Sequence, residues 1–174
     1  MPEAVQSSRG ARSSDVPPDE LRVKPITYSL QFRGRATPLS PGVLAARLTA
    51  PGWTLRTTID RDGLHGSSEA SAGEEAVLRS QLSFLNDHGF EESGEIGFGN
   101  GDSLRFRTVG RGVLERSPDP HLCHGTAMWE VDGGAGRFQS ARGRITSNFF
   151  VSDTGEITDN QLGVLFLHNH ETTQ

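Results

Sequence analysis

The segment 122–132 carries the side chains of this sequence that are best suited to chemistry. His124 and Glu130 are an even number of residues apart, so in an extended strand both point to the same side, together with Thr126 and Met128. Turned toward an interior, this face would place two polar groups among apolar ones, the usual makeup of a ligand pocket. His124 and Glu130 would lie about 20 Å apart along a strand, so each is expected to act catalytically with a partner from another strand.

The opposite face of the same segment is an equally good candidate for the interior. It presents Ala127, Trp129 and Val131, and Trp129 would then line the ligand site. The neighbouring segment alternates in the same way and puts Phe106 and Thr108 on one face. Both faces of 122–132 therefore stay open, and we expect Phe106, Thr108, Thr126, Met128 and Trp129 among the ligand-binding residues.

Two further polar side chains are candidates for contacts with a carbonyl-bearing ligand. Tyr28 is the only tyrosine and stands on the apolar face of an alternating strand, where its hydroxyl would orient a carbonyl as a third catalytic group. The alternative is that its ring packs and its hydroxyl meets water. Asn148 would offer its amide to a ligand, although asparagine near a strand end also commonly serves a turn.

Other catalytic signatures are weak. His121, Cys123 and His124 resemble metal ligands, but a strand points the first two to one side and the third to the other, so we expect no metal and no cofactor. Cys123 lacks an identifiable activating base and is expected to be a small buried hydrophobe rather than a nucleophile. No Gly-x-Ser-x-Gly elbow, phosphate loop or dinucleotide fingerprint occurs.

Composition limits the class of protein. The 174 residues carry a net charge of −5, which argues against nucleic acid as a partner, because phosphate binding needs a concentrated basic face. One cysteine and no basic region followed by an apolar run indicate a reducing, cytoplasmic location. No stretch approaches the roughly 20 apolar residues of a membrane span. We therefore expect a soluble protein without membrane contact.

The elements that must position these residues are strands. Ile26, Tyr28, Leu30 and Phe32 alternate with polar residues, and segments 55–59 and 64–70 flank an Asp-Gly hairpin turn. Residues 38–52 fit a short helix or an irregular strand. Residues 74–86 fit a helical stripe or a strand, and the strand is favoured because the turn at 86–89 leads directly into another strand-like run.

The second half has clearer turns. Turns at 99–102, 117–120, 132–134 and 153–155 separate strands over 90–98, 103–109, 122–132, 138–151 and 157–167. Strands that follow one another at this spacing should be neighbours in one antiparallel sheet. We therefore predict an all-β fold, a single closed up-and-down barrel of about eight strands over residues 23–170, because closure removes exposed edges. Residues 1–22 are predicted to be a tail, either disordered or a lid over the barrel mouth.

The run Gly134-Ala135-Gly136-Arg137-Phe138-Gln139-Ser140-Ala141-Arg142-Gly143 has the pattern Gly-x-Gly-x-Phe-x-x-Ala-x-Gly. It resembles the barrel signature of allene oxide cyclase-like and dirigent-like proteins, and residues 90–168 are similar to small bacterial proteins of that superfamily. Its glycines would let the backbone bend where a Cβ would clash, while Phe138 plugs the interior. That structural role accounts for the signature without any catalytic one.

The resemblance implies a barrel whose lumen binds an apolar small molecule and, in several members, folds an intermediate for ring closure. We therefore expect a cofactor-free cyclase or isomerase that confines a polyketide-like intermediate, with catalysis by near-attack geometry. The alternatives are a non-catalytic carrier or sensor barrel, and a structural protein whose lumen is filled by its own side chains. The expected partner is an apolar substrate, with a homodimer left open.

Overall fold

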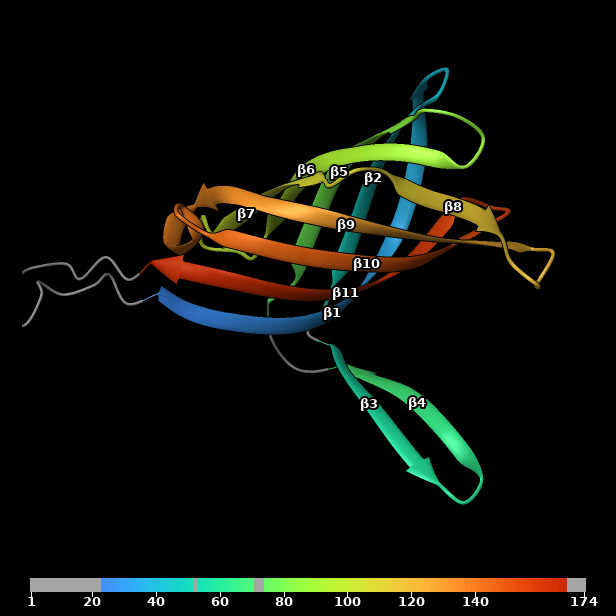
Figure 1. Ribbon diagram of the computed structural model, residues 1–174, viewed down its shortest axis with the longest axis horizontal. Helices are drawn as coiled ribbons and strands as arrows, with labels where there is room; N and C mark the ends of the chain where they lie inside the picture. Colours follow the sequence, from blue (N-terminus) through green and yellow to red (C-terminus); the bar gives the residue numbers. More distant parts are fainter. Residues whose placement is uncertain (1–22, 52, 71–73, 169–174) are drawn as a thin grey trace, which may run out of the picture.

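The chain folds almost entirely into β-strands. The computed structural model describes residues 23–51, 53–70 and 74–168, and Figure 1 shows the arrangement of the strands in them. The elements are β1 (Val23–Ser40), β2 (Val43–Ala50), β3 (Trp53–Asp60), β4 (Gly63–Ala70), β5 (Ala76–Phe84), β6 (Gly89–Gly97), β7 (Ser103–Thr108), β8 (Gly112–Arg116), β9 (Leu122–Ala135), the 3-10 turn η1 (Gly136–Phe138), β10 (Arg142–Ser152) and β11 (Glu156–His168).

The main sheet closes on itself. Its strands pair in the order β1-β2-β5-β6-β7-β9-β10-β11, and β11 pairs antiparallel with β1 over thirteen residue pairs from Val23↔His168 to Arg35↔Glu156. The short β8 continues the line of β7, because it too pairs with both β6 and β9. With β7 and β8 counted as one interrupted strand, this is a closed antiparallel barrel of eight strands, which confirms the predicted fold. The predicted tail, 1–22, and the end of the predicted domain, 169–170, lie outside the described residues.

One hairpin departs from the expected up-and-down order. β3 and β4 pair only with each other, and β2 pairs directly with β5. The turn over residues 60–63 is the predicted one, but the hairpin that it closes extends away from the barrel (Figure 1). Ile59 and Leu64, opposite each other near its tip, are exposed. Neighbours in sequence are therefore neighbours in the barrel everywhere except across this excursion.

The two ambiguous segments are both strands. Residues 43–50 form β2, with Ala46, Leu48 and Ala50 buried at alternate positions, so the helical alternative for 38–52 is wrong. Residues 76–84 form β5, as favoured. β5 lies between β2 and β6, which hydrogen-bond to its backbone on both sides. Its alternating apolar and polar side chains are compatible with this position.

The predicted turn at 132–134 is instead a bulge inside a strand. β9 continues to Ala135, and the chain turns only through η1. Opposite this site β7 has one residue between Leu104 and Phe106, whereas β9 has two between Val131 and Gly134. The extra residue is accommodated at Gly133, whose φ of 77° is easily adopted by glycine. The Gly-Gly pair thus bends the barrel wall and does not end the strand.

Another glycine of the signature allows two strands to approach closely. Gly143 has a φ of 155°, and a Cβ on it would lie 2.2 Å from the backbone oxygen of Val164 on the adjacent β11. Phe138, at the turn, is buried and packs near Phe98 with ring centroids 5.3 Å apart. Both observations agree with the predicted structural role of this run.

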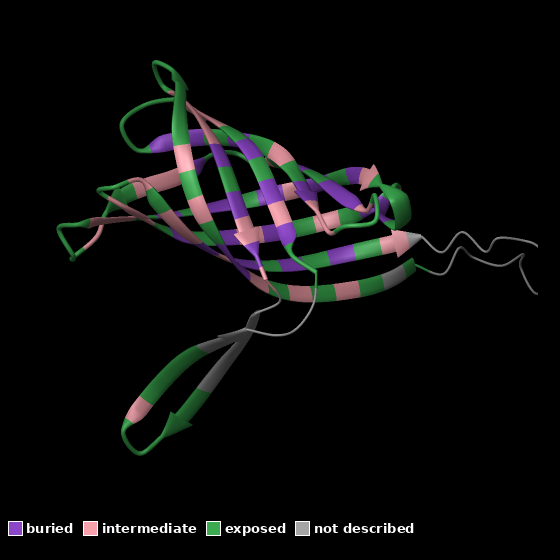
Figure 2. Cartoon of the chain, turned by 180° about the vertical axis from the view of Figure 1, so that it is seen from behind, coloured by how far each residue is buried: buried purple, intermediate pink, exposed green. Residues whose placement is uncertain are grey.

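The core occupies the inside of the barrel. Buried residues alternate with exposed ones along each barrel strand, which Figure 2 shows as bands along the ribbons. Trp129, Phe32 and Phe90 are the largest fully buried side chains. Large apolar side chains thus form the walls of the lumen, and any polar group at an inward position lies among them.

Candidate functional site

Polar side chains from six strands point into the apolar interior of the barrel. Seven of them stand at buried or half-buried inward positions, two with carboxyl groups: Tyr28 on β1, Ser80 on β5, Glu92 on β6, Trp129 on β9, Ser147 on β10, and Asp159 and Gln161 on β11. Among the described residues the buried polar or charged side chains include no lysine, arginine or histidine. The two carboxyl groups therefore lie in a low-dielectric interior without a buried cation to compensate them.

Asp159 is held by two side chains that donate to it. Ser147 Oγ donates to Oδ1 at 2.7 Å, and Gln161 Nε2 donates to Oδ2 at 2.6 Å. Burial raises the pKa of Asp159 to about 6, and these two hydrogen bonds, which favour the carboxylate, partly oppose the rise. Asp159 is 2% exposed and is mostly ionised at neutral pH.

Glu92 has the opposite protonation state at neutral pH. Burial raises its pKa to about 8, and the negative charge of Asp159 adds to the rise. Ser80 Oγ donates to Oε1 of Glu92 at 2.5 Å and lowers the pKa, as does the Trp129 indole, although Nε1 of Trp129 makes no hydrogen bond of ordinary geometry. The desolvation outweighs both donors, so Glu92 is mostly protonated at pH 7.

The barrel wall is interrupted beside Glu92. β6 pairs with β7 from Ser93 onward and with β8 up to Phe90, so residues 91 and 92 of β6 fall between the two strands. There Thr108 Oγ1 accepts a hydrogen bond from the Glu92 backbone N–H at 2.8 Å and donates to the Glu92 carbonyl at 3.0 Å. A pocket of about 370 Å³ opens at this place, lined by Gln81, Ser83, Glu91, Glu92, Ser93, Arg107 and Thr108. Glu92 therefore borders both the lumen and a polar pocket in the wall.

Among the residues that the structure describes, three buried side-chain polar atoms have no hydrogen-bond partner. They are Oη of Tyr28, Nε1 of Trp129 and Oε1 of Gln161. The register places Tyr28 and Trp129 in one row around the barrel, through Gly163 and Ile145. The Tyr28 ring lies over Gly163, where a Cβ would be 2.1 Å from the ring. Burial raises the pKa of Tyr28, with a smaller contribution from Asp159, so its hydroxyl is a donor.

Together these groups can perform proton chemistry on an uncharged molecule. The lumen offers two free donors, at Tyr28 and Trp129, one free acceptor, at Gln161, a carboxylate at Asp159 and a carboxylic acid at Glu92. Two titratable groups whose environments separate their pKa values can serve as base and acid at the same pH. The surrounding Phe and Leu side chains exclude water from the same space.

Some of the residues predicted from the sequence do face the lumen. Tyr28 and Trp129 point inward, and Phe106 is buried with its ring stacked on Trp129 at a centroid distance of 4.2 Å. Thr108 also lies at an inward position, but its hydroxyl is occupied by the backbone of Glu92. Thr108 therefore closes the gap in the wall, and the ligand contact expected of it is not available in this arrangement.

Of the two faces of 122–132 that the sequence left open, the one with Trp129 lines the interior and the one with His124 and Glu130 is the outer face. Ala127, Trp129 and Val131 are buried, whereas His124, Thr126 and Met128 are exposed. Glu130 binds Arg107 at 2.9 Å and Arg144 at 3.0 Å on the outer surface. His124 lies 4.0 Å from Glu115, also outside.

Asn148 is exposed as well, with its carbonyl accepting from Asn160 Nδ2 at 3.3 Å. The lumen positions expected for His124, Glu130, Thr126, Met128 and Asn148 are thus corrected. The physical reason is that Trp129 and its neighbours bury more apolar surface than the other face of the strand.

Sequence reasoning missed Glu92 and Asp159, together with Ser80, Ser147 and Gln161, which hold or accompany them. A signal was present: Glu92 is in phase with Phe90 and Ile96, and Asp159 is in phase with Ile157 and Leu165. A carboxyl group at an apolar position of an alternating strand is costly to bury. A buried carboxyl group such as Glu92 or Asp159 is therefore stronger evidence of a functional site than the exposed His124.

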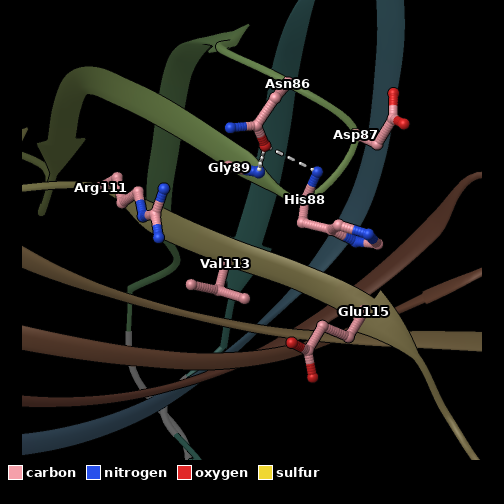
Figure 3. A pocket seen from close by; sticks show the side chains of 7 residues that line it. All are labelled: Asn86, Asp87, His88, Gly89, Arg111, Val113 and Glu115. Atoms are coloured by element: carbon pink, nitrogen blue, oxygen red, sulfur yellow. Dashed lines mark hydrogen bonds between the residues drawn. The ribbon is translucent and has the colours of Figure 1, made fainter.

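A second pocket lies between the 86–89 turn and β8 (Figure 3), with a volume of about 480 Å³. Oδ1 of Asn86 accepts from the backbone N–H groups of His88 and Gly89, at 3.0 and 2.6 Å, so this side chain is used by the turn itself. Arg111 and Glu115 stand at separate edges of the pocket in Figure 3. Its polar groups do not converge, which makes it a weaker candidate than the lumen.

The described residues of the two pockets do not form a metal site. Within the described ranges, no three His, Cys, Asp or Glu side chains are grouped so that they would hold a metal ion. His121, one of the three residues considered as ligands, instead lies 3.1 Å from Asp153, and Cys123 is free and half-buried.

Comparison with known proteins gives no family for this chain. No protein-family model matches the sequence, and no curated protein matches it either. In the part of the chain that the structure describes, no helix has the length and apolar character needed to span a membrane. The resemblance to allene oxide cyclase-like proteins stays a prediction, and the functional argument depends on the lumen.

Proposed function

We propose that the barrel lumen binds an apolar small molecule carrying a carbonyl or hydroxyl oxygen and promotes its isomerisation or ring closure by confining it. The observation that carries this proposal is the set of three buried polar atoms without partners, on Tyr28, Trp129 and Gln161. Buried polar groups are almost always hydrogen-bonded, because leaving one unpaired costs about 1–3 kcal/mol. A bound molecule with one oxygen would satisfy the donors, and one with a hydroxyl would also satisfy Gln161.

The apolar walls define the rest of the ligand. Phe32, Phe90, Leu78 and Ile145 are buried around the polar cluster. A charged or strongly hydrated molecule would lose its solvation there without a compensating cation, whereas a hydrocarbon chain or ring would not. A polyketide-like intermediate, apolar with spaced oxygens, has the required character. Holding such a chain in a near-attack conformation lowers the barrier to ring closure without a cofactor.

Binding is tested by the fluorescence of the lumen tryptophan. The sequence has two tryptophans, so a Trp53→Phe background leaves Trp129 as the only indole emitter. A graded series of linear 2-alkanones and conjugated dienones is titrated into this variant. We expect saturable quenching that Tyr28→Phe weakens about tenfold, the value of one hydrogen bond to the ligand. Asn148→Ala, on the outer face of β10, is the control and leaves the titration unchanged.

Turnover is tested with the unmodified chain. Linear polyenes that carry a ketone are incubated with it, and products of unchanged mass are sought by a shift in chromatographic retention. A product that forms with the wild type and is reduced in Tyr28→Phe supports the proposal. Quenching without product assigns the lumen to carriage of the ligand. No quenching by any compound of the series contradicts ligand binding altogether.

A further inference from the structure

The lumen holds its two carboxyl groups in different ways. Ser147 and Gln161 each donate to one oxygen of Asp159, which is the arrangement that suits a carboxylate, since each oxygen accepts one hydrogen bond and keeps further acceptor capacity. Glu92 accepts a short hydrogen bond from Ser80 at Oε1, and burial raises its pKa to about 8, so it is mostly protonated at pH 7. The first group is arranged as a base and the second as an acid.

The two groups also share one electrostatic environment. The charge of Asp159 raises the pKa values of both Glu92 and Tyr28, so the three groups are coupled across the lumen. Cys123 also stands at an inward position by the alternation of β9, and no buried basic side chain is found among the described residues. A proton moving between substrate and carboxyl groups is therefore controlled by these few groups.

Glu92 lies beside a pocket in the barrel wall. It borders the polar pocket in the wall, whose lining includes Gln81, Ser93 and Arg107. Water in that pocket would restore the proton of Glu92 after each transfer. Asp159, enclosed by Ser147, Gln161 and the rings of Phe32 and Phe149 in its register row, would take its proton from the substrate and exchange it with solvent while the enol is bound.

We propose that Asp159 and Glu92 form an acid–base pair that moves a proton at the carbon next to the carbonyl of an apolar ketone bound in the lumen. This rests on the proposed function, because it needs a ligand in the same place. The ketone oxygen accepts hydrogen bonds from the Tyr28 hydroxyl and the Trp129 indole, the two free donors. These contacts stabilise negative charge as it develops on that oxygen.

The transfer balances without a cofactor. The Asp159 carboxylate takes a proton from the α-carbon, the C–H electron pair becomes the carbon–carbon double bond of the enol, and the carbonyl π pair moves onto oxygen. That oxygen takes the proton of Glu92. Asp159 is now the acid and Glu92 the carboxylate. The reverse step restores both groups and returns a proton to the α-carbon. For a β,γ-unsaturated ketone the proton can return to the γ-carbon instead, which moves the double bond into conjugation with the carbonyl.

Deuterium exchange tests this step directly. 2-Heptanone and 4-penten-2-one are incubated with the full chain in D₂O, and exchange at carbons next to the carbonyl is followed by NMR. We expect exchange above the buffer rate, lowered about 100-fold or more by Asp159→Asn and less by Glu92→Gln. Glu130→Gln, which removes an outer carboxylate, is the matched control and stays within about twofold of wild type.

If the lumen variants do not fold, the pH profile of the wild-type exchange rate tests the same acid–base pair. The rate should rise as Asp159 ionises near pH 6 and fall as Glu92 ionises near pH 8. A flat profile between pH 5 and 9, or full exchange in a folded Asp159→Asn, overturns the acid–base pair. Trp129 quenching by the same ketones without exchange overturns the pair while leaving the binding function in place, whereas no quenching overturns both.

Discussion

Carboxyl side chains have opposite surroundings on the inner and outer faces of the barrel. On the outer face Glu130 lies between Arg107 and Arg144, at 2.9 and 3.0 Å, in contact with solvent. On the inner face Glu92 and Asp159 have hydroxyl and amide donors, and the described residues place no buried cation beside them. The outer carboxylate is neutralised and solvated, whereas the inner ones have raised pKa values.

This contrast explains where chemistry is to be sought in such a barrel. A solvated ion pair contributes little to stability. A carboxyl group in an apolar interior is costly to ionise, so its proton is available to any molecule that shares the space. The comparison makes four predictions, from the largest effect to the smallest.

The largest expected effect is a difference in stability loss between alanine substitutions at two adjacent residues of β9. Trp129→Ala removes a side chain that is 1% exposed, and we expect a loss of about 3–5 kcal/mol of unfolding free energy from the lost burial and the cavity. Met128→Ala removes one that is 47% exposed and should change stability by no more than about 0.5 kcal/mol. Urea denaturation of both variants measures the difference, and similar losses would contradict the assignment of faces.

The second prediction is that the barrel loses stability as pH rises from 5 to 8.5. The pKa values of Glu92 and Asp159 are about 8 and about 6 in the folded chain, against ordinary values of 4.5 and 3.8. Between these limits the folded chain binds more protons than the unfolded one. The stability is fully present below the ordinary values and is lost as pH rises through the folded ones, by up to about 1.4 kcal/mol per pH unit for each group.

Glu92→Gln should flatten this decline, because the amide stays neutral at every pH. Glu130→Gln should leave it unchanged. Denaturant unfolding at intervals of half a pH unit measures both. A wild type equally stable at pH 5 and 8.5 would show that the two lumen carboxyl groups are already ionised in the folded chain.

The sequence predicted the strands well because their local signals agree with the final structure. The turn at 99–102 has positive φ at Gly99, Asn100 and Gly101, the conformation that those residue types indicate. The bulge at Gly133 was interpreted as a turn, because the same Gly-Gly pair serves both, and only the partner strand β7 distinguishes them. The excursion of β3 and β4 left no local signal, since its turn is that of any hairpin.

The choice of inward face could not be made from one strand alone. In β9 the outer Met128 and the inner Ala127 are similar in hydropathy, and in β11 the outer Leu162, Val164 and Phe166 are exposed at 40–51%. Apolar residues on both faces remove the contrast on which period-two reasoning depends. Tyr28 was placed correctly because β1 alternates cleanly, whereas Glu92 and Asp159 required the register of the whole barrel.

The third prediction concerns the gap in the wall. Thr108→Val keeps the shape of the side chain but removes the hydroxyl that bonds both the N–H and the carbonyl of Glu92. We expect a loss of about 1–3 kcal/mol, because two backbone groups lose their partner. Thr146→Val, whose exposed hydroxyl makes a single 3.4 Å bond to Leu162, is the control and should cost less than about 0.5 kcal/mol. Faster amide exchange at Glu92 in Thr108→Val would locate the effect.

The smallest effect is expected for the outer ion pairs. A double-mutant cycle with Glu130→Gln and Arg144→Ala should give a coupling energy below about 1 kcal/mol at low salt, because both side chains are at least one-third exposed and solvent screens them. In 1 M NaCl the Debye length falls to about 3 Å, and the coupling should disappear. A coupling that survives high salt would mean that Glu130 is shielded from solvent. The outer face of β9 would then have to be reconsidered as a second place where a carboxyl group is kept from water.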